Sequence, residues 1–239
     1  MLIPVKHAKR IIVSSYIKKL IERGESQHLD FKFGITDSRK IARSLVAFCN
    51  SEGGTLLIGV KDNGAIAGVR SDEEYYMVEA AANLYCKPAI IFQTHEWNVE
   101  GKTVLEVTVL SDPNVLYHAP DKDGNWKVYV RVEDHNLLAN SVYLKARKRK
   151  KAKKGVFLEY TDKEKILLTY LDLNFSVTLS KFCRIANINR YKAEITLANL
   201  IALDVVEQVL TEHGCYYKLK DGNLQFPLKE RYPKDFEKW

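Results

Sequence analysis

The segment from Glu25 to Val69 constrains the fold of this chain more than any other stretch. It begins ESQHLDFKF, where apolar and polar residues alternate as in a half-buried β-strand. It ends NSEGGTLLIGVKDNGAIAGV, in which Gly53-Gly54 precedes a short apolar run and Asp62-Asn63-Gly64 is typical of a hairpin turn. Residues 37–50 between these parts have the apolar spacing of a helix. The segment therefore predicts a strand, a helix and a buried central strand.

The rest of residues 1–144 predicts further helices and strands in an irregular order. Residues 4–23 have the pattern of an amphipathic helix that ends at Gly24. Another helix is expected at 72–85, and a hairpin is expected around Glu100-Gly101. This order predicts an α+β fold with a mixed sheet, because a regular βαβ winding would alternate the two kinds of element.

The last part of the chain, residues 156–239, predicts a smaller second domain. It contains a helix capped by Thr161, a short strand-and-helix element, a third helix capped by Asn189 and a hairpin that turns at His213-Gly214. Three helices followed by a β-hairpin predict a winged helix-turn-helix domain.

The positive charge of the chain is concentrated in one decapeptide. Residues 145–154, KARKRKKAKK, hold eight basic residues and no acid. Residues 1–144 have a net charge of −1 and residues 156–239 are neutral, so this run accounts for the excess of +7. We expect residues 145–155 to form a basic connector, which can continue a helix that begins near Asn140.

Several classes of protein are disfavoured by motifs that the sequence lacks. No apolar run approaches the ~20 residues of a membrane span, and no signal peptide is evident. The four cysteines lie far apart without a CxxC pair, which predicts reduced thiols in a cytoplasmic protein and disfavours a zinc site. No GxxxxGK[ST] loop is present, so ATP hydrolysis is not expected.

Residues 20–140 resemble the Schlafen-type Alba-like domain, AlbA_2, also described as a divergent AAA or DNA-binding domain. The resemblance rests on four motifs: LIERGESQHLDFK, AFCNSEGGTLLIGVKDNGAIAGV, KTVLEVTV and VYVRVEDHNLLA. The family usually has glutamate at the position of Asp30, and a glycine-containing turn where this chain has Val-Glu-Asp-His after Arg131.

The resemblance implies a candidate catalytic and metal site made of Glu25, Asp30 and Asp62, which match the catalytic acids of the ribonuclease members. It implies Mg²⁺- or Mn²⁺-dependent cleavage of structured RNA such as tRNA. Clustered carboxylates can hold such ions, which polarise a phosphate and activate water. Glu25 and Asp30 are an odd number of residues apart, so they meet only if Glu25 lies in a turn, which Gly24 permits, or if a bulge intervenes. The alternative is that these are ordinary solvated and turn residues.

Nucleic-acid contacts are predicted in three places. Lys32 can contact a phosphate or neutralise Asp30. The basic run can neutralise several phosphates, or be a solvated helix face. The start of the third helix offers amide and cationic groups suited to base edges and phosphates. The predicted binding residues are Lys32, Arg147, Lys148, Arg149, Lys150, Lys151, Asn189, Arg190 and Lys192.

These features support three functional hypotheses. The first is a nucleic-acid-binding protein that regulates transcription, because many bacterial members of the resembled family carry a winged helix and are described as regulators. The second is a metal-dependent endoribonuclease. The third is a winged-helix module for dimerisation or protein docking, which would make the chain a homo-oligomer.

Overall fold

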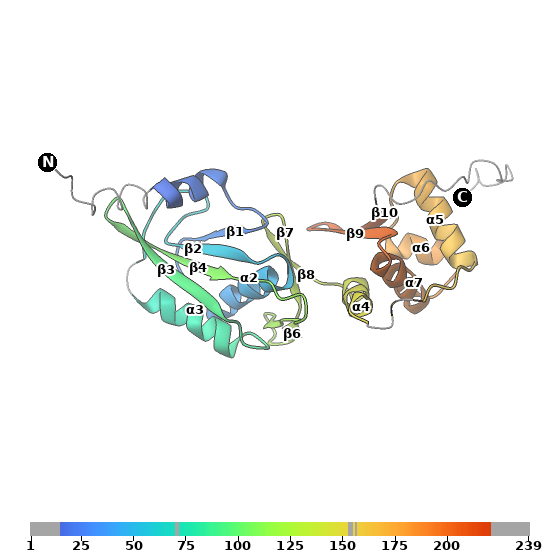
Figure 1. Ribbon diagram of the computed structural model, residues 1–239, viewed down its shortest axis with the longest axis horizontal. Helices are drawn as coiled ribbons and strands as arrows, with labels where there is room; N and C mark the ends of the chain where they lie inside the picture. The colour runs from blue at the N-terminus through green and yellow to red at the C-terminus, as the bar shows by residue number, and fades with distance from the viewer. Residues whose placement is uncertain (1–14, 70–71, 153–154, 156, 221–239) are drawn as a thin grey trace. The chain divides into compact units, whose positions relative to one another are not determined.

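The computed structural model describes residues 15–69, 72–152, 155 and 157–220 (Figure 1). The chain divides into two compact units, residues 1–139 and 140–239. Residues 145–150 of the basic run lie in a helix of the second unit. Lys151 of that run is described just after the helix. Lys153, Lys154 and residues 4–14 of the predicted first helix lie outside the described residues.

The first unit is built on a four-stranded sheet with the order β1-β2-β4-β3. Strand β1 (Leu29–Lys32) is parallel to β2 (Gly54–Ile58), and helix α2 (Ser38–Asn50) connects the two. Strand β4 (Lys102–Val109) is antiparallel to β2 and to β3 (Phe92–Val99). The predicted mixed sheet is therefore confirmed, with the TLLI run as an interior strand.

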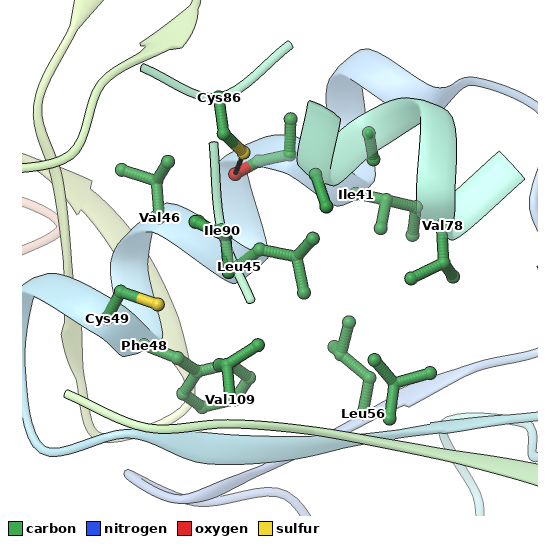
Figure 2. Close-up of a cluster of buried hydrophobic side chains, with 14 of the residues drawn as sticks. Ile41, Leu45, Val46, Phe48, Cys49, Leu56, Val78, Cys86, Ile90 and Val109 are labelled. Carbon is green, nitrogen blue, oxygen red and sulfur yellow. Dashed lines mark hydrogen bonds between the residues drawn. The ribbon is translucent and has the colours of Figure 1, made fainter. Parts of the chain in front are cut away.

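Helices α2 and α3 (Glu73–Leu84) bury their apolar side chains with those of one face of the sheet. Figure 2 shows Leu45 of α2 above the sheet residue Val109, and Phe48 of the same helix belongs to the same buried cluster. A Cβ atom on Gly54 would lie 2.3 Å from the Phe48 ring, so the second glycine of the pair allows the helix to approach this strand.

A helix at residues 15–23 covers part of the opposite face of the sheet. Its Ile17 is fully buried and belongs to a cluster with Phe31 of β1 and Leu57 of β2. The sheet is thus covered on both faces, which explains why Leu56 and Leu57 are both fully buried although neighbouring strand residues point to opposite sides.

Two short hairpins complete the first unit. They are formed by β5 (Ala119–Pro120) with β6 (Trp126–Lys127), and by β7 (Tyr129–Val132) with β8 (His135–Leu138).

Asn50 at the end of α2 connects the helix to the segments of both hairpins. Its Nδ2 donates at 2.9 Å to the carbonyl oxygen of Tyr117, just before β5, and at 2.9 Å to that of Tyr129, the first residue of β7.

The second unit has its own core, in which Leu167, Phe182 and Leu197 are fully buried. A capping box between Thr161 and Glu164 starts its second helix, as expected for a Ser/Thr-x-x-Glu sequence. Its elements, in chain order, are α4 (Ser141–Lys150), α5 (Asp162–Asn174), α6 (Leu179–Ile185), α7 (Arg190–Ala202), β9 (Val206–Thr211) and β10 (Gly214–Leu219). Helices α5 to α7 followed by the β9–β10 hairpin have the order on which the winged-helix prediction rests.

Candidate functional site

A tight turn brings Glu25 and Asp30 together. Ser26 and Leu29 exchange backbone hydrogen bonds of 2.8 and 3.3 Å, which folds the chain back just before β1. Gly24, with φ +73°, leads into this turn. The Glu25 carboxylate therefore lies beside the strand, where it hydrogen-bonds to Asp30 and its Oε1 accepts the Phe31 N–H at 2.8 Å.

Burial and the neighbouring Asp30 carboxylate raise the pKa of Glu25, and the Phe31 N–H opposes them only in part. Burial disfavours the charged form, and a hydrogen bond between two carboxyl groups requires a proton on one of them. The Glu25 carboxyl group therefore binds its proton more readily than an exposed carboxyl group does.

The charge of Asp30 is compensated inside the protein. Asp30 is 3% exposed. Lys32 Nζ lies 2.8 Å from its Oδ2, and Arg131 Nη2 lies 3.5 Å from its Oδ1. Ser44 Oγ of α2 also donates to Oδ2 at 3.4 Å. Of the two roles predicted for Lys32, the structure shows the neutralisation of Asp30.

Arg131 is the residue of this cluster that the candidate set omitted. Its buried guanidinium donates from Nε to Ser26 O at 3.2 Å, from Nη1 to Asn136 Oδ1 at 3.1 Å and from Nη2 to Leu29 O at 3.1 Å. Asn136 in turn donates to Ser44 Oγ at 2.9 Å. Arg131 thus fixes the turn before β1 and closes a buried polar network. The sequence signal was an arginine inside the otherwise apolar run VYVRV.

Charged side chains of this cluster form hydrogen bonds with the backbone N–H and C=O groups on the outer edge of β1. This strand lies at the edge of the sheet, and an edge strand presents unpaired N–H and C=O groups. Arg131 donates to Leu29 O, Glu25 accepts from Phe31 N, and Lys32 Nζ donates to Phe31 O at 2.8 Å. Glu25, Lys32 and Arg131 therefore have a structural role, because they replace a neighbouring strand.

Asp62 lies apart from the other two predicted acids. It is exposed in the turn after β2, where Gly64 N donates to Lys61 O at 2.8 Å. Asp30 pairs with Leu56, so Asp62 is six residues further along the chain than the partner of Asp30. Within residues 15–69, 72–152, 155 and 157–220, no group of three His, Cys, Asp or Glu side chains could hold a metal ion.

The expected three-carboxylate site is therefore not assembled in this structure, and the residues present do not fit a Mg²⁺ or Mn²⁺ ion held by Glu25, Asp30 and Asp62. The physical reason is topological. The turn before β1 brings Glu25 back to Asp30, whereas the Asp62 turn follows the end of the parallel strand β2.

Residues 145–150 of the basic run lie in helix α4, which packs along α7. Val142 and Ala146 of α4 are buried in the core of the second unit. Lys145 forms an ion pair with Glu194 of α7, and Lys150 Nζ lies 3.0 Å from Asp204 Oδ1, just after α7. Lys145 and Lys150 are thus partly neutralised by acids of the same unit.

Glu194 joins α4 to the start of α7. Its Oε1 accepts from Arg190 Nε at 2.9 Å, and its carboxylate also hydrogen-bonds with Lys145 and Ser141. Burial raises the pKa of Glu194, but these three hydrogen bonds outweigh it and lower the pKa to about 2. The ionised carboxylate therefore holds cations of two helices on one surface.

The other predicted binding residues of the second unit differ in exposure. Lys148, Lys151 and Lys192 are exposed, and Arg147 and Arg149 are half-buried. Arg147 Nη1 donates to Tyr143 Oη at 3.4 Å. Asn189 is the N-cap of α7, because its Oδ1 accepts from Lys192 N at 2.9 Å; this confirms the cap.

The α+β arrangement with a mixed sheet defines the class of the first unit, and comparison with known families identifies it further. Residues 25–140 match the family described as Schlafen, AlbA_2. This part of the chain is therefore similar to Schlafen AlbA_2 domains.

Solved structures give weaker similarities. The DIP2311 protein from Corynebacterium diphtheriae is 18% identical with a TM-score of 0.42, and the match covers 64% of this chain but only 30% of that protein. The N-terminal domain of a RecG-related protein from Nitrosomonas europaea is 19% identical with a TM-score of 0.34, covering 52% of this chain and 89% of that domain. No curated protein matches the sequence significantly. In the part of the chain that the structure describes, no helix has the length and apolar character needed to cross a membrane.

Proposed function

We propose that this chain binds nucleic acid through a basic surface of the second unit, made by α4 and the first turn of α7. The observation that carries the proposal is the carboxylate of Glu194, which binds Lys145 of α4 and Arg190 of α7 together. This contact brings Lys145, the first residue of the basic run, next to the start of α7, although the two are separate in the sequence.

The charges of this surface suit a phosphate backbone. Lys145 and Lys150 are paired with acids, but Lys148, Lys151 and Lys192 are exposed cations. Each lysine or arginine that neutralises a phosphate releases counterions, which gives an affinity that falls steeply with salt. The RecG-related protein is named as a DNA helicase relative, but its low structural similarity adds no support.

The experiment compares two variants with the same change in charge. Lys148, Arg149 and Lys151 are replaced by glutamine in one variant, while Lys150 is kept because it pairs with Asp204. The control replaces Lys40, Lys122 and Lys127, three exposed lysines of the first unit, by glutamine. We expect weaker binding and a salt dependence reduced by about one unit of slope per lost phosphate contact in the first variant only. Unchanged binding of the α4 variant at low salt, or equal loss in the control, would contradict the proposal.

The finer hypothesis is regulation of transcription by a winged helix on duplex DNA. It is supported by the order of α5, α6, α7 and the β9–β10 hairpin. It requires a duplex of defined sequence, so selection of bound fragments from random duplexes should yield one motif.

The dimerisation hypothesis predicts a concentration-dependent dimer in analytical ultracentrifugation, and a monomer at high concentration would count against it.

The endoribonuclease hypothesis has support only from the contact between Glu25 and Asp30. Asp62 would have to move to join them. Incubation of the protein with total tRNA, with and without Mn²⁺, tests the hypothesis. Cleavage that is abolished by Asp62→Ala would support it, whereas intact tRNA under all conditions would exclude it.

A further inference from the structure

Tyr191 is an exposed aromatic ring among cations. It lies in the first turn of α7 and is 65% exposed. Lys145 Nζ lies 5.4 Å from the centre of its ring, and the neighbouring Arg190 side chain is 74% exposed. An exposed aromatic side chain bordered by lysine and arginine is typical of sites where a base stacks while cations contact the adjoining phosphates.

The cations around Tyr191 are held in place. Glu194, whose side chain is 8% exposed, binds both Lys145 and Arg190. Arg190 uses Nε for this bond, and a guanidinium has further N–H donors on its two terminal nitrogens for a phosphate. The ring and its cations therefore need little reordering when a ligand binds, which favours affinity.

Helix α4 covers one flank of α7 along its length. Ser141 and Lys145 contact Glu194 near the start of α7, and Lys150 reaches Asp204 just beyond its end. Between these points Val142 and Ala146 are buried in the core that contains α7. The two helices thus form one layer.

This layer is too broad to enter the major groove of duplex DNA side-on. The groove is about 12 Å wide, and one helix with its side chains already measures about 10–12 Å. Packed helices have axes about 8–10 Å apart, so α4 and α7 together span roughly 20 Å. In a duplex, moreover, both faces of each base are covered by its neighbours. Only an unpaired nucleotide offers a face to the ring of Tyr191.

From these contacts we infer that the basic surface binds single-stranded nucleic acid, with an unpaired base stacked on Tyr191 and the adjoining phosphates bound by Arg190 and Lys192. The inference rests on the proposed function and specifies its ligand. It differs from the insertion of α7 into the major groove of a duplex.

The test is fluorescence anisotropy with the full chain and three labelled probes: oligo(dT), oligo(U) and a DNA duplex of the same length. We compare Tyr191→Ala and Tyr191→Phe with Tyr160→Ala, which removes a 55% exposed aromatic side chain of the same unit. Tyr191→Ala should weaken binding of the single strands about 5- to 150-fold, the range expected for loss of one base stack. Tyr191→Phe and Tyr160→Ala should bind as the unaltered protein does. The oligo(dT) and oligo(U) arms distinguish DNA from RNA, because only the latter has a 2′-hydroxyl.

A second readout reports stacking directly. An oligonucleotide containing 2-aminopurine should lose fluorescence on binding to the unaltered protein and to Tyr191→Phe, but not when Tyr191→Ala is saturated. Thermal unfolding of each variant shows whether it is folded. Tighter binding of duplex than of single strands, or equal single-strand binding by Tyr191→Ala, would overturn the inference and leave the proposed function standing. Absence of binding to all three probes would overturn both.

Discussion

Asp30 of β1 and Arg131 of β7 form a buried ion pair, with Oδ1 and Nη2 3.5 Å apart. Their side chains are 5% and 1% exposed, and the two residues lie far apart in the sequence of the first unit. Arg131 also binds the carbonyls of Ser26 and Leu29 on either side of the turn that presents Glu25. One arginine therefore organises the strand edge on which two of the candidate acids lie.

Replacement of Arg131 by methionine should destabilise the first unit by about 3–5 kcal/mol, because Asp30 would remain buried with only Lys32 as a cation. Urea unfolding monitored by tryptophan fluorescence measures this change. The exposed Arg39, changed to methionine, serves as the control and should cost less than about 0.5 kcal/mol. A loss below about 1 kcal/mol for Arg131→Met would show that the pair is not structural.

Glu25→Gln should stabilise the protein at neutral pH and have little effect in acid. Burial and Asp30 raise the pKa of Glu25, so between the ordinary and the raised pKa the folded state binds more protons than the unfolded state. Stability contributed by this group is therefore highest in acid and falls as the pH rises through that window. Melting temperatures at about pH 4 and about pH 7 test this, since the variant should gain over the unaltered protein only at the higher pH. An equal shift at both values would be inconsistent with a raised pKa.

Glu133→Gly should stabilise the β7–β8 hairpin. Glu133 has φ +55°, a left-handed conformation that costs a non-glycine residue about 1–2 kcal/mol, although glycine is also more flexible when unfolded. The expected net gain is about 0.5–1 kcal/mol in chemical denaturation. Asp134→Gly in the same turn lacks the positive φ and should destabilise instead. If both variants lose stability, the backbone at Glu133 is not strained.

Glu194→Gln should destabilise the second unit by about 2 kcal/mol at neutral pH, because its folded pKa is lowered to about 2. A lowered pKa means that the ionised form stabilises the fold above the ordinary carboxyl range. This contribution is lost as the pH falls from about 4.5 towards 2. The difference between variant and unaltered protein should therefore shrink on acidification, as measured by denaturant unfolding at several pH values. A difference that is constant with pH would show that Gln disturbs packing only.

Local chemistry made much of the fold predictable. Thr161 and Asn189 cap helices because Ser/Thr and Asn oxygens can accept the first free N–H groups of a helix, whatever follows in three dimensions. The alternation in LDFK predicted that Leu29 and Phe31 face the same side of a strand, and both are buried in one cluster with Ile17 of the helix at 15–23. These features depend on residues within a few positions of one another.

The sequence predicted less well which residues meet at the candidate sites. The sequence did not predict the role of Arg131, because its partners, the carbonyls of Ser26 and Leu29, are distant in the sequence. The separation of Asp62 from Asp30 depends on strand register, which no spacing in the sequence reveals. In the sequence Lys150 does not differ from the neighbouring basic residues, and only the structure places it beside Asp204.

The sequence by itself determined the mixed α+β first unit, the helix caps, the turns at Gly24 and Asp62 and the concentration of charge in residues 145–154, because periodicity, turn chemistry and charge are local properties. Only the tertiary structure decided that Glu25 meets Asp30 without Asp62, that Arg131 holds the turn before β1, and that Glu194 joins Lys145 to Arg190. These outcomes depend on strand register and helix packing, which bring together side chains that the sequence keeps far apart.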